Sequence, residues 1–77
     1  MPRKRIKPVP KDQKQIGNNV RKIRHELDLS QMAFAEKLDM NVSAIQRIEE
    51  GGDFKVSTLK KMVKILNVSV KEILGFQ

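Results

Sequence analysis

The chain has 77 residues and no cysteine, so it forms one small domain without a disulfide framework or a thiolate metal site. No run approaches the roughly 18 apolar residues that cross a bilayer, and the basic start lacks the apolar core of a signal peptide. The formal net charge is +7, and all of the excess lies in residues 1–27, because residues 28–77 carry seven basic and seven acidic side chains. A basic segment beside a neutral domain favours a polyanionic partner, nucleic acid before an anionic membrane surface. Solvated charge that only aids solubility is the alternative.

The first segment, residues 1–11 (MPRKRIKPVPK), combines three prolines with five basic side chains. Proline lacks an amide hydrogen and like charges repel, so we expect an extended basic arm here and a folded domain over residues 12–77. Asp12 and Gln15 form a capping-box pattern that predicts the start of the first helix. Gly17 inside this helix costs about 1 kcal/mol relative to alanine, which suggests close packing. The apolar face of the helix is predicted to hold Ile16, Val20, Ile23 and Leu27.

A second helix is predicted to begin after Ser30, which is a good N-cap, and to bury Phe34, Ala35 and Leu38. The stretch that follows, EKLDMNVSAIQ (residues 36–46), contains no glycine or proline, so it allows one continuous helix or two helices that meet at an angle. A continuous helix would turn Met40 away from the apolar face and leave Ile48 at its margin. A turn between the two stretches accounts for every apolar residue, so we predict two helices.

The predicted turn lies at Asp39–Asn41. Asp39 tolerates the left-handed conformation that such a turn usually requires. Asn41 is among the best N-cap residues, and we expect its side chain to bind the amide of Ser43 or Ala44.

The rest of the chain predicts two more helices. Gly51 supplies a left-handed cap after the third helix, and the next segment, VSTLKKMVKILN, places three lysines outside and an apolar face inside. Asn67 closes that helix, and Ser69 caps a last short one with Val70, Ile73 and Leu74. No stretch alternates with a period of two, so the sequence predicts a compact, all-α domain of short helices.

Several of these residues resemble a known family. Ala35 between Phe34 and Leu38, Met40 in the turn, and then Ile45 and Ile48 resemble the helix-turn-helix of the phage repressor and Cro (XRE-type) family. IGNNVRKIRHELDLSQMAFAEKL is similar to the first two helices of that family, SAIQRIEEG to its third, and LKKMVKILNVSVKEIL to its last two. The resemblance covers residues 16–74 and implies a five-helix, repressor-like fold. Two residues depart from the pattern, because Asp39 stands where glycine is usual and Phe34 where leucine is common.

The resemblance implies that the helix over residues 42–50 lies in the major groove. The residues then expected to contact bases are Asn41, Val42, Ser43, Gln46 and Arg47. Arg47 suits guanine but would also hold a phosphate, and Gln46 suits adenine. Val42 suits a thymine methyl group, or is a partly covered residue without a role. By the same resemblance Gln31, Gly52 and Lys55 contact the DNA backbone, while Arg24 and Glu49 form a structural ion pair.

The basic arm, with Arg3, Lys4, Arg5 and Lys7, is expected to lie along the duplex or in its minor groove. The alternative is a tail without fixed contacts. His25 has no partner at ligand spacing, and no serine has a histidine or lysine arranged to activate it, so we expect no metal, no cofactor and no catalysis.

The resemblance thus predicts a sequence-specific regulator that binds double-stranded DNA. We expect it to act as a homodimer on a pseudo-palindromic operator, because one small domain makes too few base contacts for specific binding alone. The resemblance places it in the prokaryotic cytoplasm, at the nucleoid when bound. The candidate dimer surface is Val70, Ile73, Leu74 and Phe76, which could equally be the last layer of the core. One alternative is an antitoxin that binds a protein toxin and regulates its own operon. Another is a membrane-surface or RNA binder, which the proline-rich arm and the lack of tyrosine and tryptophan disfavour.

Overall fold

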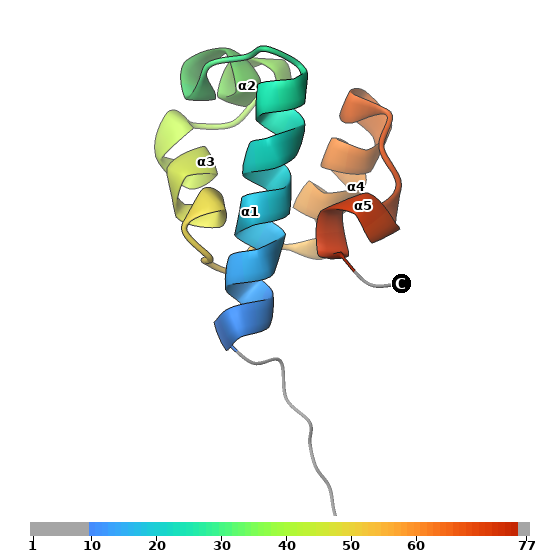
Figure 1. Cartoon of the computed structure of the whole chain (residues 1–77). Helices are drawn as coiled ribbons and strands as arrows, with labels where there is room; N and C mark the ends of the chain where they lie inside the picture. The colour runs from blue at the N-terminus through green and yellow to red at the C-terminus, as the bar shows by residue number, and fades with distance from the viewer. Residues whose placement is uncertain (1–9, 76–77) are drawn as a thin grey trace, which may run out of the picture.

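The computed structural model describes the backbone of residues 10–75 and the side chains of residues 13–75. This part of the chain contains five helices and no strand (Figure 1). The helices are α1 (Pro10–Glu26), α2 (Gln31–Lys37), α3 (Val42–Glu49), α4 (Val56–Leu66) and α5 (Val70–Leu74). The predicted all-α, five-helix fold is confirmed.

The start of α1 differs from the prediction. The helix begins at Pro10, so the capping box predicted at Asp12 does not open it. Proline is well suited to the first turn of a helix, because the amide hydrogen that it lacks has no partner there and its fixed φ is already helical. Three prolines in eleven residues predicted an extended segment, and the last of them instead starts the helix.

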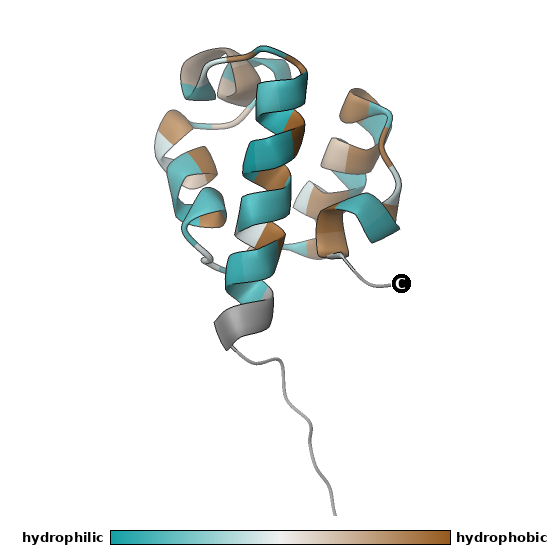
Figure 2. Cartoon of the chain, viewed as in Figure 1, coloured by the Kyte–Doolittle hydropathy of each residue, from teal (hydrophilic) through white to brown (hydrophobic). Residues whose placement is uncertain are grey.

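Helix α1 lies at the centre of the domain, with α3 on one side and α5 on the other, while α2 packs against α3 (Figure 1). Figure 2 shows apolar residues recurring along the helices between polar ones, as the helical spacing predicts. The apolar residues meet in one core, and each fully buried side chain stabilises the fold by about 1.5–3 kcal/mol. The buried members are Val20, Ile23, Phe34, Ala35, Leu38, Ile45, Ile48, Met62, Leu66 and Ile73.

A sharp turn joins α2 to α3, as predicted. Asp39 has a φ of 55°, and the amide of Met40 donates to the carbonyl of Ala35 at 2.8 Å, which closes the end of α2. Met40 is half-buried and packs against the core at this corner. Asn41 is the N-cap of α3, but its side chain makes no capping hydrogen bond within the described residues, so that part of the prediction is wrong. The carbonyl of Asn41 accepts from Ala44 at 3.0 Å, and this backbone bond starts the helix.

The close packing predicted for Gly17 is present between α1 and the end of α3. A Cβ atom on Gly17 would lie 2.6 Å from the carbonyl oxygens of both Ile48 and Glu49, which is too close for any side chain. These are backbone atoms at the end of a packed helix, so they cannot move aside cheaply. Gly17 therefore sets the distance at which α1 supports α3.

The last two helices end and begin as predicted. Asn67 takes a left-handed conformation after α4, with a φ of 56°. Ser69 and Glu72 form a capping box at the start of α5. The side-chain amide of Asn19 then donates to the carbonyl of Ile73 at 3.1 Å and fastens the end of α5 to α1.

Candidate nucleic-acid interface

Helix α3 has one buried side and one exposed side. Its buried side consists of Ile45, Ile48 and Glu49, which face α1 and the core. The side chains predicted to face outward are all exposed: Val42, Ser43, Gln46 and Arg47. Positions one, two, five and six of a helix share one side, so these residues form a continuous row, which we call the reading row.

Asn41 directly precedes the reading row, and its side chain makes no capping hydrogen bond among the described residues. Asn41 is exposed, and since its side chain caps nothing among the described residues, its amide is available to a ligand. Val42 is 36% exposed, an apolar side chain partly in solvent next to polar neighbours. Both residues line an open hollow between α2 and α3, together with Met32, Glu36 and Met40.

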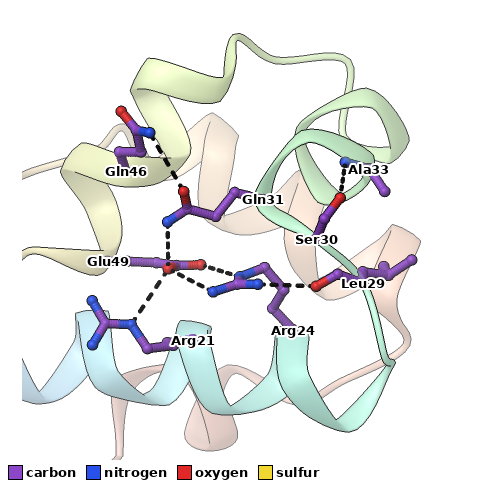
Figure 3. Close-up of polar contacts among 8 residues, drawn as sticks. All are labelled: Arg21, Arg24, Leu29, Ser30, Gln31, Ala33, Gln46 and Glu49. Atoms are coloured by element: carbon purple, nitrogen blue, oxygen red, sulfur yellow. Dashed lines mark hydrogen bonds and ion pairs between the residues drawn. The ribbon is translucent and has the colours of Figure 1, made fainter.

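At the C-terminal end of α3, the carboxylate of Glu49 is fully buried and heavily bonded (Figure 3). Arg24 donates from Nε to Oε2 at 2.7 Å and from Nη2 to Oε1 at 3.2 Å, so the predicted pair between α1 and α3 exists as a two-point contact. Arg24 also donates to the carbonyl of Leu29 at 2.9 Å. Arg21, which is half exposed, lies 3.4 Å from Oε1 and joins the same group. We call the side chains of Glu49, Arg24, Arg21 and Gln31 the Glu49 cluster.

The Glu49 cluster keeps the carboxyl ionised. Burial by itself would raise the pKa of Glu49, but hydrogen bonds from Arg24 and Gln31 and the charge of Arg24 outweigh it, so the pKa lies below its ordinary value of 4.5. Glu49 is therefore a carboxylate near neutral pH, and a carboxylate only accepts hydrogen bonds.

Gln31, the first residue of α2, connects the Glu49 cluster to the reading row (Figure 3). Its Nε2 donates to Oε1 of Glu49 at 3.0 Å, and its Oε1 accepts from Nε2 of Gln46 at 3.4 Å. Gln31 is partly exposed, so it also reaches the surface beside α3. These two bonds join the start of α2 to both the buried and the exposed side of α3, so Gln31 supports that helix.

Gly52 has a structural role that the sequence did not reveal. Its amide donates to the carbonyl of Arg47 at 2.8 Å, so this amide is not available to a phosphate. A Cβ atom at Gly52 would lie 2.6 Å from Cγ of Arg47. The bare backbone therefore leaves room for the stem of Arg47, and a contact of Gly52 with DNA stays a prediction.

Lys55 lies close to the reading row. It is the exposed N-cap of α4, and its carbonyl accepts from the amides of Thr58 and Leu59. Lys55 and Arg47 line the same open hollow between α3 and the start of α4, so their charges belong to one face of the domain. The arm residues Arg3, Lys4, Arg5 and Lys7 lie outside the described residues.

The predicted dimer surface needs a correction at Ile73, which is fully buried in the core between α5 and α1. Its side chain is fully covered and so cannot contact a second subunit. The bond from Asn19 to the carbonyl of Ile73 holds the end of α5 against α1. Leu74 is partly buried against the same core, and Val70 is 39% exposed. Phe76 lies outside the described residues.

Residues 13–75 contain no group of three or more histidine, cysteine, aspartate or glutamate side chains placed to hold a metal ion. Within residues 10–75, no helix has the length and apolar character that a membrane span requires.

The turn at Asp39 sets α3 at an angle to α2, and the reading row faces outward. This arrangement defines a helix-turn-helix domain. In that class of domain the second helix of the motif enters the major groove of DNA. A family model described as helix-turn-helix matches residues 20–73, which is most of the chain. The chain therefore belongs to the XRE-type helix-turn-helix family of DNA-binding transcription regulators, the family that its sequence resembles. No curated protein matches the chain.

Proposed function

We propose that the protein is a sequence-specific transcription regulator that inserts α3 into the major groove and acts as a homodimer on a pseudo-palindromic operator. The observation that carries this proposal is the reading row: adjacent exposed side chains on a helix whose opposite side is held by the Glu49 cluster. A rigid support matters because contacts to base edges require side chains in fixed positions.

In this proposal each residue of the reading row, and Asn41, contacts a different group on the bases. Arg47 has a planar fork of donors that fits the O6 and N7 acceptors of guanine. Val42 supplies an apolar surface for a thymine methyl group, since part of its side chain is exposed at the start of α3. Ser43 and Asn41 are short and exposed at the end of α3 that would enter the groove, so they suit single hydrogen bonds to bases.

Contacts to phosphate would position the helix. Lys55 shares a hollow with Arg47, and Gln31 reaches the surface at the first turn of α2, so both flank α3. Such contacts set register and affinity but not sequence preference. The basic arm would add salt-dependent affinity along the duplex, because each phosphate that it neutralises releases counterions.

A homodimer would double the few base contacts that one domain makes. The proposed surface is Val70 with the exposed part of Leu74, and Phe76 at the end of the chain. The prokaryotic, cytoplasmic location implied by the sequence resemblance belongs to the same proposal.

Selection of binders from a random duplex library by the full chain tests the proposed function. We expect an enriched inverted repeat whose half-sites are centred about 10–10.5 base pairs, or a multiple, apart. Recovery of a single half-site would overturn the dimer, and no enrichment at all would overturn sequence-specific binding. Co-purification with a protein toxin that the chain neutralises would support the antitoxin alternative instead.

A further inference from the structure

Three side chains form a line from the interior of the domain to the reading row. Glu49 is buried at the end of α3, Gln31 is partly buried at the start of α2, and Gln46 is exposed one turn before Glu49 (Figure 3). They are joined by one bond of 3.0 Å from Gln31 to Glu49 and one of 3.4 Å from Gln46 to Gln31. We call this line the amide relay.

The direction of every bond in the amide relay follows from its buried end. Ionised Glu49 offers only acceptors, so Gln31 must turn its NH₂ group toward the carboxylate. The carbonyl of Gln31 then faces Gln46, which in turn directs its own NH₂ group to that oxygen. Reversing Gln31 would set its oxygen against the carboxylate, so that two acceptors would face each other without a proton between them.

The outer end of the amide relay therefore has a fixed polarity. With Nε2 of Gln46 directed at Gln31, the carbonyl oxygen Oε1 of Gln46 is left to accept, and one hydrogen of its NH₂ group is left to donate. The exposed edge of Gln46 thus offers one acceptor beside one donor. A freely rotating glutamine could offer the same pair in either order or turn both hydrogens outward.

Among the bases, adenine has the complementary pattern in the major groove, with a donor at N6 and an acceptor at N7. Guanine offers two acceptors, O6 and N7, so one of them would face the carbonyl of Gln46. Cytosine offers a donor and thymine an acceptor next to a methyl group, so each satisfies only half of the amide.

We propose that Glu49, acting through Gln31, fixes the side-chain amide of Gln46 so that it selects adenine over guanine at one base pair of each half-site. This inference rests on the proposed function, because it assigns one base of the sequence that α3 would read. Glu49 and Gln31 act here as positioning residues, and Gln46 is the residue that touches the base. A good two-point contact discriminates against the wrong base by roughly five- to 150-fold.

The test begins with the operator selected by the wild-type chain. Each position of the half-site is changed in turn, and the ratio of affinities for adenine and guanine is measured for the wild type and for Gln46→Ala. The position read by Gln46 is the one at which this variant loses its preference. We expect adenine there in the wild type, favoured by about tenfold or more. Guanine at that position, or no position at which Gln46→Ala changes the preference, would overturn the inference.

The amide relay itself is tested with Gln31→Met, which keeps the length of the side chain and leaves Arg24 to bind Glu49. We expect the adenine-to-guanine ratio at the Gln46 position to fall several-fold, because the amide of Gln46 is then free to turn over. The matched control is Lys55→Ala, whose loss of a phosphate contact should weaken both duplexes equally and leave the ratio unchanged. An unchanged ratio in Gln31→Met would overturn the relay.

The design separates the two proposals. If the wild type binds every duplex equally, the proposed function fails and the inference fails with it. If the wild type selects an operator but Gln46 or Gln31 behaves differently from the expectation, only the inference fails. Circular dichroism verifies that Gln31→Met is folded; should it unfold, Gln46→Ala still tests the choice of adenine, because it leaves the Glu49 cluster intact.

Discussion

At the C-terminal end of α3, Glu49 is buried and bonded to side chains from α1 and α2, and Gly17 brings the backbones of α1 and α3 together. At the N-terminal end, Asn41 begins the helix with a backbone bond and without a side-chain cap among the described residues, after a strained turn at Asp39. The C-terminal end thus fixes the helix to the domain, while at the N-terminal end the side-chain amide of Asn41 makes no capping bond. This division suits a helix that must stay in place while its leading end bonds to something else.

The largest loss of stability should come from removing the buried carboxylate at the C-terminal end of α3. Glu49→Ala leaves Arg24 buried without its partner, and we expect the free energy of unfolding to fall by about 3–5 kcal/mol in urea denaturation. Glu50→Ala is the matched control, because Glu50 is the exposed neighbour and its loss should change stability by less than about 0.5 kcal/mol. Similar losses in the two variants would show that the buried pair does not anchor α3.

The next effect concerns the approach of α1 to α3. Gly17→Ala would place Cβ 2.6 Å from two backbone oxygens, so the helices must separate, and we expect a loss of about 1–3 kcal/mol. Asn18→Ala, at the exposed position beside it, should be neutral or slightly stabilising, because alanine favours the helix. A Gly17→Ala variant as stable as the wild type would contradict the close packing. Thermal unfolding of both variants provides the comparison.

A smaller effect is expected in acid. Because the pKa of Glu49 is lower in the folded protein than its ordinary value of 4.5, the unfolded chain binds a proton there at higher pH than the folded one. The stabilisation from this group is therefore complete above about pH 4.5 and is lost as the pH falls through the folded-state pKa. Urea denaturation across this range should show a weaker dependence on pH in Glu49→Gln than in the wild type. Equal slopes would mean that other carboxyl groups account for acid unfolding.

The smallest effect should occur at the free end. Asn41→Ala removes no capping bond, so we expect it to cost less than about 0.5 kcal/mol of stability. Ser30→Ala is the matched control, because the hydroxyl of Ser30 accepts from the amide of Ala33 at 3.0 Å and its loss should cost about 1 kcal/mol. If Asn41→Ala is the more costly of the two in urea denaturation, the leading end of α3 is not free.

Much of the fold followed from local patterns. The turn between α2 and α3 was predictable because only a break at Asp39–Asn41 accounts for Met40 and Ile48, although no glycine or proline marks it. The exposed side of α3 was predictable for the same reason, since helical periodicity divides its residues into two sides. Ser30 and Ser69 cap helices as expected, because the N-cap bond joins residues only a few positions apart.

The errors arose where local patterns allow more than one outcome. Pro10 is compatible with an arm or with a first turn, and the structure places it in the helix. Asn41 has the right chemistry for a side-chain cap, but a backbone bond already starts the helix and the side chain remains outward. Ile73 and Val70 both lie on the apolar side of a short helix, and only the packing of α5 on α1 buries one and exposes the other.

The sequence by itself determined the helices, the corner between α2 and α3 and the residues that α3 turns outward, because each depends on neighbours along the chain. Only the tertiary structure decided which side chains bond to the buried side of α3. Residues 24, 31 and 49 come from three different helices, and the bonds that join them depend on how those helices pack. The direction in which Gln46 presents its amide is set at that buried contact between helices, so no local pattern in the sequence could have specified it.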